Sequence, residues 1–282
     1  MNEMNGTSTR NSSSSTKGLA EVYVVTSGKG GVGKTTTTAS IGAALALKGK
    51  RTLVIDADIG LRNLDVILGL ENRVVFNLVD VAKGACKGHQ AIIKSKKSNN
   101  LFMLPASQTD DKDVVSEEEV KQVVEAYRRE FHFILIDSPA GIEQGFKNAC
   151  AAADKALLVT TPEVSAIRDA DRVVGLLAAR GVESNLILNR VDFEMIRRGD
   201  MLSVEDVQEI LGVELIGVVK RDDEVIVAAN CGEPVSYNTR SEAGAAFNRI
   251  ASRMCGEGIP VIDELQAQGT FWGRLGRRFG VV

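Results

Sequence analysis

The chain has 282 residues, of which 44% are hydrophobic and 25% are charged, and its formal net charge is -3 at pH 7. This composition is typical of a globular protein with a large buried core, and no run of about 18 apolar residues predicts a membrane-spanning helix. The acidic balance lacks the positive field of a protein that holds nucleic acid through many phosphates, so DNA is a poor first candidate for its ligand.

The N-terminus and the cysteines indicate a cytosol-like compartment. Residues 1–19 are rich in Ser, Thr and Asn and contain no apolar core of a signal peptide, so they predict a disordered tail. The four cysteines, at positions 86, 150, 231 and 255, form no C-x-x-C pair. This spacing lacks the usual metal-binding and redox motifs and favours reduced thiols.

Strands and helices alternate along the chain from residue 22 to about residue 254. A β-branched run at 22–25 precedes a glycine-rich stretch, and the segment 35–47 predicts a helix that ends at Gly49. The spacing from Ser116 to Glu119 is that of a capping box at the start of another helix. Further strands are expected at 52–55, 101–104, 133–136, 156–159, 186–188 and 215–219, and further helices at 116–129, 163–180, 203–211 and 241–254.

The predicted strands are continuously apolar, which indicates burial on both faces. Such strands, alternating with helices, predict one doubly wound α/β domain over residues 20–256, with a mostly parallel sheet and helices on both of its faces. Ligands of such sheets bind beyond the carboxyl ends of the strands. Several polar segments follow strands directly and are therefore expected to converge on one crevice: GKGGVGKT, Asp56 with Asp58, Asp137, and Asn189 with Arg190.

Residues 28–35 match the phosphate-binding motif G-x-x-x-x-G-K-[ST] in full, between a predicted strand and a predicted helix. Backbone N–H groups of such a loop face phosphates, Lys34 can reach the β and γ oxygens, and Thr35 can ligate Mg²⁺. Asp137, at the end of a distant strand, suits the magnesium or its water shell. The candidate ATP-binding residues are Gly28, Lys29, Gly30, Gly31, Val32, Gly33, Lys34, Thr35, Thr36, Asn189 and Arg190.

A second lysine, Lys29, lies only five residues before Lys34. Two cations this close repel each other by about 1 kcal/mol or more, so Lys29 calls for a compensating role. From the outer edge of the loop it could reach a nucleotide held by a second subunit and stabilise the transferring phosphoryl group, as an arginine finger does. The site would then be complete only in a homodimer. The alternative is an ordinary solvated lysine.

Several stretches of the sequence resemble those of a known protein family. KGGVGKTTT, with its extra lysine, resembles the deviant Walker A (MinD/ParA) ATPases. The strings VIDADIGLRNLDVILGLENRVV, LPASQTDDKD, IDSPAGIE, TTPEVSAIRDADRVVGLL and RRGDMLSVEDVQEILG resemble the MinD, septum-site-determining branch, so the similarity covers nearly the whole chain after residue 22. The resemblance implies a slow, partner-stimulated ATPase that dimerises with ATP and places the cell or plastid division site.

The resemblance also implies roles for partners and for individual residues. The partners would be the division inhibitor MinC and a topological regulator such as MinE or a polar scaffold, with the stretch 168–172 as part of the partner surface. Without the resemblance, the mixed charges of that stretch would indicate an exposed helix face. Lys29 would cross the dimer interface, Asp58 would position the attacking water, Asp56 and Asp137 would serve the magnesium site, and Asn189 would contact adenine.

Other members of the wider family are the alternatives. A ParA-type DNA-partition ATPase shares the loop and Lys29 but needs a basic surface, and a flagellar-number ATPase is separated only by the long strings quoted above. An iron–sulfur carrier would need paired cysteines at a dimer interface. On the base side, Lys220 and Arg221 stand where relatives usually have a proline and an acid, so phosphate binding is a firmer expectation than adenine selectivity.

The C-terminal segment predicts a helix that lies on a membrane. Residues 257–268 resemble a linker, and 269–282 form the sequence GTFWGRLGRRFGVV. On a helix, one arc of about 100° contains Phe271, Trp272, Leu275, Phe279 and Val282, and the arginines fall on the other side. A helix of about 14 residues spans only roughly 21 Å, less than the hydrocarbon core of about 30 Å. The candidate membrane-binding residues are Phe271, Trp272, Arg274, Leu275, Arg277, Arg278 and Phe279.

Three arginines without an acid favour an anionic lipid surface. The alternative is a frayed or core-docked tail, which Gly273 and Gly276 would favour. One short helix binds weakly, but joining two in a dimer raises avidity by about 10² to 10⁴, so ATP would control membrane residence. The expected location is the cytoplasm and the cytoplasmic face of the cell membrane, or, alternatively, the chloroplast stroma and inner envelope.

Overall fold

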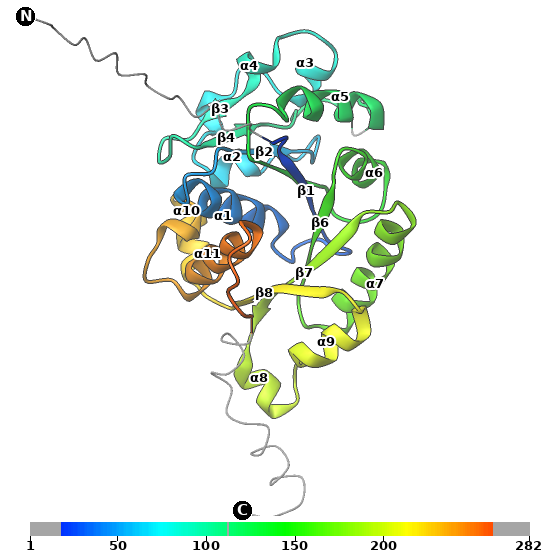
Figure 1. Ribbon diagram of the computed structural model, residues 1–282, viewed down its shortest axis with the longest axis vertical. Coiled ribbons are helices and arrows are strands. Elements are labelled where there is room, and N and C mark those ends of the chain that lie inside the picture. The colour runs from blue at the N-terminus through cyan, green and yellow to red at the C-terminus, as the bar shows by residue number, and fades with distance from the viewer. Residues whose placement is uncertain (1–17, 112, 262–282) are drawn as a thin grey trace, which may run out of the picture.

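The computed structural model describes residues 18–111 and 113–261. One eight-stranded sheet, in the order β3-β4-β2-β5-β1-β6-β7-β8, lies between two layers of helices (Figure 1). Neighbouring strands are parallel except at the edge, where β3 pairs antiparallel with β4. The predicted doubly wound, mostly parallel α/β fold is confirmed. The predicted tail (1–19) and linker (257–268) lie largely outside the described residues, and the predicted terminal helix (269–282) lies wholly outside them.

The strands are β1 (Glu21–Thr26), β2 (Thr52–Asp56), β3 (Ile93–Lys94), β4 (Leu101–Leu104), β5 (Phe133–Asp137), β6 (Lys155–Thr160), β7 (Glu183–Val191) and β8 (Glu214–Lys220). The α-helices are α1 (Lys34–Leu47), α2 (Leu64–Ile67), α3 (Leu78–Ala82), α4 (Gly88–Ala91), α5 (Glu117–Tyr127), α6 (Gln144–Ala151), α7 (Val164–Ala179), α8 (Phe193–Arg198), α9 (Val204–Leu211), α10 (Glu224–Asn230) and α11 (Glu242–Met254). Short 3-10 helices occur at Glu71–Arg73 and Val235–Tyr237.

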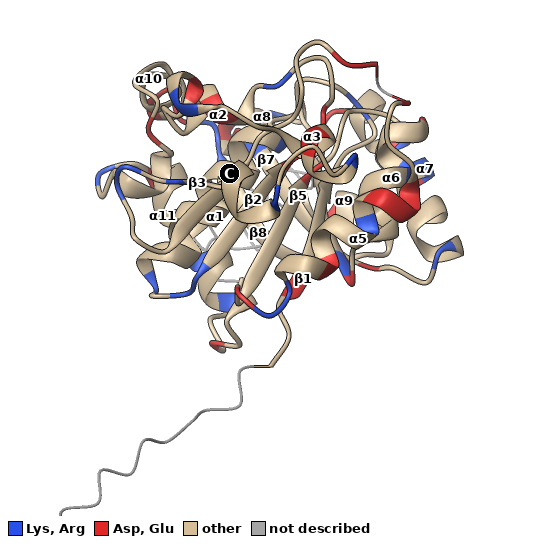
Figure 2. Cartoon of the chain, turned by 90° about the horizontal axis from the view of Figure 1, so that it is seen from above, with Lys and Arg blue, Asp and Glu red and all other residues tan. Residues whose placement is uncertain are grey.

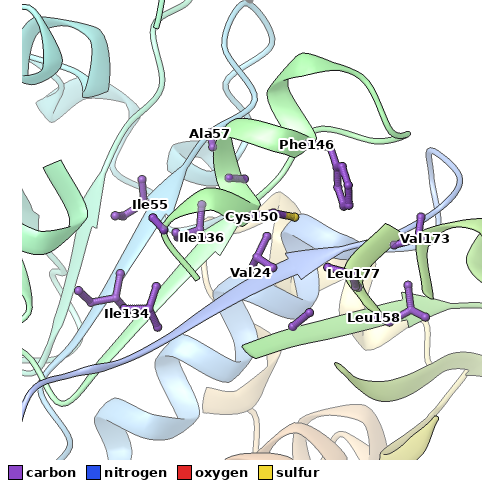
Figure 3. Close-up of a cluster of buried hydrophobic side chains, with 14 of the residues drawn as sticks. Val24, Ile55, Ala57, Ile134, Ile136, Phe146, Cys150, Leu158, Val173 and Leu177 are labelled. Atoms are coloured by element: carbon purple, nitrogen blue, oxygen red, sulfur yellow. The ribbon is translucent and has the colours of Figure 1, made fainter. Parts of the chain in front are cut away.

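The central strands are buried on both faces. In β1, Val24 faces one layer of helices and Val25 faces the other. Helices α5, α6, α7 and α9 cover the first face, and α1 and α11 cover the second. Figure 3 shows the cluster on the first face, which includes Val24 of β1, Ile136 of β5, Phe146 of α6 and Leu177 of α7. Burial on both sides explains why these strands are continuously apolar rather than alternating.

The charged residues lie around the sheet. In Figure 2 the central strands are mostly tan, while blue and red segments are interspersed on the surrounding helices and loops. No acidic or basic half is visible in that view. None of the helices within the described ranges is long and apolar enough to cross a bilayer.

Every predicted strand is present; the strand predicted at 101–104 has the bounds of β4, and the others extend by one to three residues at one or both ends. The predicted capping box is confirmed, because the Glu119 N–H donates to Ser116 Oγ over 3.3 Å and the Ser116 N–H donates to Glu119 Oε2 over 2.8 Å. Strand β3 and six short helices were not predicted from the sequence, namely α2, α3, α4, α6, α8 and α10. These helices have only four to eight residues, too few for a clear period of 3.6.

Candidate active site

The glycine-rich loop joins the buried end of β1 to the start of α1, as the motif requires. Gly33, the residue before α1, has a φ of +97°, and a Cβ atom there would lie 2.5 Å from Asn189 Nδ2. A Cβ atom at Gly28 would overlap the backbone carbonyl of Asp169 in α7. These two glycines are therefore needed for close contact with α7 and with the end of β7.

The predicted magnesium residues Thr35 and Asp137 come together at this loop. Asp137 ends β5 with only 1% of its surface exposed, and its Oδ1 accepts a hydrogen bond of 3.1 Å from Thr38 Oγ1. The Thr35 hydroxyl is also a hydrogen-bond partner of this carboxyl. Lys34, the first residue of α1, is nearly buried and acts on Asp137 as a neighbouring positive charge. Thr38 was not among the predicted residues, although it lies one helical turn after Lys34.

Asp56 supports the segment that carries Asp58. It ends β2 in register with Asp137 on the neighbouring strand and is equally buried. Its Oδ1 accepts the Asp58 N–H over 3.0 Å, and its Oδ2 accepts the N–H groups of Asn63 and Leu64, each over 3.1 Å. The backbone thus uses both oxygens of Asp56, which fixes the loop after β2 beside the phosphate loop.

The two neighbouring carboxyls are costly to ionise in the absence of a metal. Burial raises the pKa of Asp137 to about 7, and the charge of Asp56 adds to the effect, whereas Thr35, Lys34 and Thr38 oppose it. Burial likewise raises the pKa of Asp56 to about 6, against the hydrogen bonds that it accepts from the backbone. The site therefore holds more buried negative charge than Lys34 alone can balance, which is a favourable setting for a divalent cation.

A small cavity of about 240 Å³ lies beside Asp58. It separates the loop after β2, with Ala57 and Ile59, from the loop after β5, with Pro139 and Ala140. Since one water occupies roughly 30 Å³ of liquid, this space can hold several waters next to the Asp58 carboxyl.

Lys29 contacts the start of α7 in its own chain. Its Nζ donates to Ser165 Oγ over 3.2 Å and lies 3.9 Å from Glu163 Oε2. The lysine side chain is 44% exposed, so this contact is a weak surface one. The predicted reach of Lys29 into a second subunit stays a prediction.

Asn189 and Arg190, near the end of β7, approach the loop from the other side. Asn189 is only 8% exposed, its Nδ2 donates to the Val32 carbonyl over 2.8 Å, and its Oδ1 accepts the Arg190 N–H over 2.9 Å. Arg190 has a φ of +56°, a left-handed conformation that no other non-glycine residue shows within the described ranges. Asn189 therefore ties the phosphate loop to β7, a role that the prediction of an adenine contact did not include.

An open cleft of about 1150 Å³ runs from Gly33 and Thr36 past Asn189 to Lys220 and Arg221. Its apolar lining comes from α8, α10 and the loop before α9, and these residues were missed because no local motif distinguishes them. They are Met195, Ile196, Met201, Leu202, Val225 and Ile226.

The other predicted residues fall on α7 or beyond the described chain. In the stretch 168–172, Arg168, Asp171 and Arg172 are exposed, whereas Ala170 is buried. The candidate membrane-binding residues between positions 271 and 279 lie outside the described residues. All four cysteines are free, as predicted; Cys150 is buried and Cys231 is exposed.

Comparisons with known proteins match the chain to one nucleotide-binding family. The family model of the CobQ/CobB/MinD/ParA nucleotide binding domain matches residues 23–235. The chain is 49% identical to the septum site-determining protein MinD of Bacillus subtilis, over 86% of this chain and 92% of that protein. Among solved structures, it resembles the MinC:MinD cell division protein complex of Aquifex aeolicus, with a TM-score of 0.81 and 49% identity over 86% of this chain and 98% of that one. It also resembles the septum site-determining protein MinD complexed with Mg-ADP from Pyrococcus horikoshii, with a TM-score of 0.77 and 30% identity over 84% and 96% of the two chains.

Proposed function

This chain belongs to the MinD septum site-determining proteins of the CobQ/CobB/MinD/ParA nucleotide-binding family, and on that basis we propose an ATP-driven cycle between cytoplasm and membrane. In this cycle the protein binds ATP, dimerises, recruits a division inhibitor to the membrane and leaves after hydrolysis of ATP to ADP and phosphate. One observation carries the proposal: a complete phosphate loop faces two buried strand-end carboxyls, Asp56 and Asp137.

The loop and α1 would hold the triphosphate. The first N–H groups of a helix have no partner within the helix, and the helix dipole places partial positive charge at that end. Lys34 adds a full positive charge beside them. Because Gly33 and Asn189 fix the backbone at the N-terminus of α1, these donors need little reorganisation to bind phosphate.

Thr35 and Asp137 fit a Mg²⁺ ion, since a hydroxyl and a carboxylate are the oxygen ligands that this ion prefers. The buried charge of Asp56 and Asp137 supports the fit, because a divalent cation would balance it. Bound Mg²⁺ supplies neutralisation of the charge on the β- and γ-phosphates. Asp56 would act through the loop that it fixes rather than as a direct ligand, since its oxygens accept three backbone N–H groups.

Asp58 would orient the attacking water. Its carboxyl borders the cavity of about 240 Å³, and Asp56 fixes its backbone. A carboxylate that is held in place can align a water with the γ-phosphate, which is the main task of protein groups in phosphoryl transfer.

Lys29 would complete the site of a second subunit. Its contacts with Ser165 and Glu163 are exposed and therefore easily exchanged for a phosphate. A dimer that places Lys29 on the partner's nucleotide would couple assembly to hydrolysis, because neither subunit has a complete site alone.

The exposed residues Arg168, Asp171 and Arg172 on α7 would form part of the surface for the division inhibitor MinC. The solved structure of the MinC:MinD complex from Aquifex aeolicus, 49% identical to this chain, supports MinC as the partner. A topological regulator such as MinE or a polar scaffold would stimulate hydrolysis.

The segment 269–282 would bind anionic lipid, weakly in the monomer and strongly in the dimer. The test is co-sedimentation of the full chain with vesicles that contain phosphatidylglycerol, in the presence of ATP or ADP, next to a variant that lacks residues 270–282. We expect sedimentation only for the full chain with ATP, and ATP-dependent dimers of the truncated variant that remain in the supernatant.

Two results would contradict this proposal. Sedimentation of the truncated variant would exclude the tail as the anchor. Retention on plasmid DNA with ATP, without binding to vesicles, would favour a DNA-partition ATPase instead.

A further inference from the structure

Two arginines line the open cleft beyond Asn189, where the base of a nucleotide held at the phosphate loop would lie, and neither makes an ion pair within the part of the chain that the structure describes. Arg190 lies near the end of β7 and Arg221 follows β8. The neighbouring Lys220 differs from both, because its Nζ lies 2.8 Å from Glu242 Oε2. An unpaired guanidinium in a cleft is a strong candidate for a ligand contact, since it presents five donors in a fixed plane.

The backbone fixes the two arginines next to each other. The Arg221 N–H donates to the Val191 carbonyl over 3.1 Å, which joins the ends of β7 and β8. Asn189 accepts the Arg190 N–H, and the left-handed φ of Arg190 lies within an irregularity of β7, where the pairing with β8 shifts register before Val191 pairs with Lys220. Both guanidiniums therefore start from defined positions along the same wall.

Most carboxylates along this side of the cleft already accept hydrogen bonds or form ion pairs within the chain. Asp222 accepts hydrogen bonds from Ser241 Oγ over 2.6 Å and from two backbone N–H groups. Asp192 caps α8, and Asp200 pairs with Arg198 over 2.9 Å. Asp223 is exposed at the start of α10. The cleft is also lined by Glu163, which lies 3.9 Å from Lys29 Nζ, and by Asp206, which accepts the Ser203 N–H over 3.0 Å. Most carboxylates of the cleft thus have partners, whereas the guanidiniums of Arg190 and Arg221 are donors without an ion pair in the described residues.

We propose that Arg190 and Arg221 determine base specificity and that the cleft accepts guanine nucleotides about as well as adenine nucleotides. Guanine presents two acceptors, O6 and N7, on one edge, which matches a guanidinium with two parallel N–H groups. Adenine presents N7 beside the N6 donor, so it forms only one such hydrogen bond with a guanidinium. The apolar lining, such as Met195 and Met201, would contact the faces of either base. This inference rests on the nucleotide-binding function proposed above.

The test measures binding of fluorescent mant-ATP and mant-GTP, with Mg²⁺, to the full chain. For the wild type, we expect the two dissociation constants to agree within about tenfold. Arg221→Glu should raise the dissociation constant for GTP by about 10- to 100-fold and should change that for ATP by less than about threefold. Arg197→Glu is the control, because Arg197 lies on α8, pairs with Glu194 and does not line the cleft, so it should leave both constants unchanged.

The outcomes separate this inference from the proposed function. A wild type that binds ATP but binds GTP about 100-fold more weakly would overturn the inference and leave the ATPase proposal intact. Equal loss of both nucleotides in Arg221→Glu would also overturn it, provided that the melting temperature of the variant is unchanged. Failure of the wild type to bind either nucleotide would instead overturn the proposed function.

Discussion

Replacement of Asp137 by asparagine should stabilise the protein at pH 8 when nucleotide and magnesium are absent. In the folded chain, burial raises the pKa of Asp137 to about 7, whereas an aspartate in an unfolded chain has a pKa near 3.9. The folded state therefore favours the protonated carboxyl. As the pH rises from about 4 to about 7, ionisation lowers the free energy of unfolding, and the full cost is present above this window. Asparagine is neutral at every pH and avoids this cost.

The size of the effect follows from the shift. A pKa raised by about three units corresponds to an upper limit of about 4 kcal/mol. Asparagine can still accept the hydrogen bond of Thr38, but it loses the attraction of Lys34, so we expect a net gain of about 1–2 kcal/mol. For a chain of this size, such a gain raises the melting temperature by about 2–6 °C.

The assay is thermal unfolding at pH 5, 6.5 and 8 in the presence of EDTA. The advantage of Asp137→Asn should grow with pH, and Mg-ADP should stabilise the wild type more than the variant. Asp154→Asn is the matched control. Burial opposes ionisation of Asp154, but hydrogen bonds from Arg128 and from the Val22 N–H outweigh it and lower its pKa, so this charge stabilises the fold at all three pH values. A loss of stability in Asp137→Asn that is equal at every pH would refute the reasoning.

Three further predictions concern single residues. Lys29→Ala should still bind nucleotide within about threefold of the wild type but should lose stimulated hydrolysis by about 10³-fold, measured as phosphate release; turnover at the wild-type rate would exclude the trans role. Gly33→Ala should lower the free energy of unfolding, measured in urea, by about 1–3 kcal/mol, because Gly33 has a φ of +97° and approaches Asn189 closely. Gly175→Ala is the control, since a Cβ atom at Gly175 on α7 meets open space, and it should be neutral or stabilising by up to about 1 kcal/mol. Similar effects at both sites would contradict this explanation. The exposed Cys231 should react rapidly with a thiol reagent. The buried Cys150 should react only after unfolding, because burial raises its pKa to about 12. Mass spectrometry identifies the modified thiols, and rapid modification of Cys150 in the native protein would contradict this expectation and show that α6 opens readily.

The features that the sequence predicted correctly depend on local patterns. The phosphate loop has a contiguous signature, and the strand-end position of Asp137 follows from the apolar run before it. Parallel packing then brings Thr35 and Asp137 together without any further information. The central strands were predictable for the same reason, since burial on both faces leaves a continuous apolar run.

The features that were missed depend on contacts between distant segments. Asn189 donates to the carbonyl of Val32, which lies 157 residues earlier, and Lys29 contacts Ser165, which lies 136 residues later. No pattern within either segment encodes these pairings. The role of Asp56 is a different case, because its partners Asn63 and Leu64 are close in sequence. The local sequence pattern is the same for a strand-end aspartate that binds a metal and for one that accepts hydrogen bonds from the backbone of the following loop.

Helix α7 gives the proposed partner surface a short physical path to the phosphate loop. The backbone of Asp169 packs against Gly28 so closely that a Cβ atom does not fit between them, and the hydroxyl of Ser165 accepts a hydrogen bond from the exposed side chain of Lys29. The exposed residues Arg168, Asp171 and Arg172 lie within one turn of the same helix. A partner that displaces the N-terminal part of α7 must therefore move Gly28, release Lys29, or do both. Under the proposed roles, a partner on α7 would reach Lys29 directly, because the proposed partner surface and Lys29 lie at the same contact between α7 and the phosphate loop.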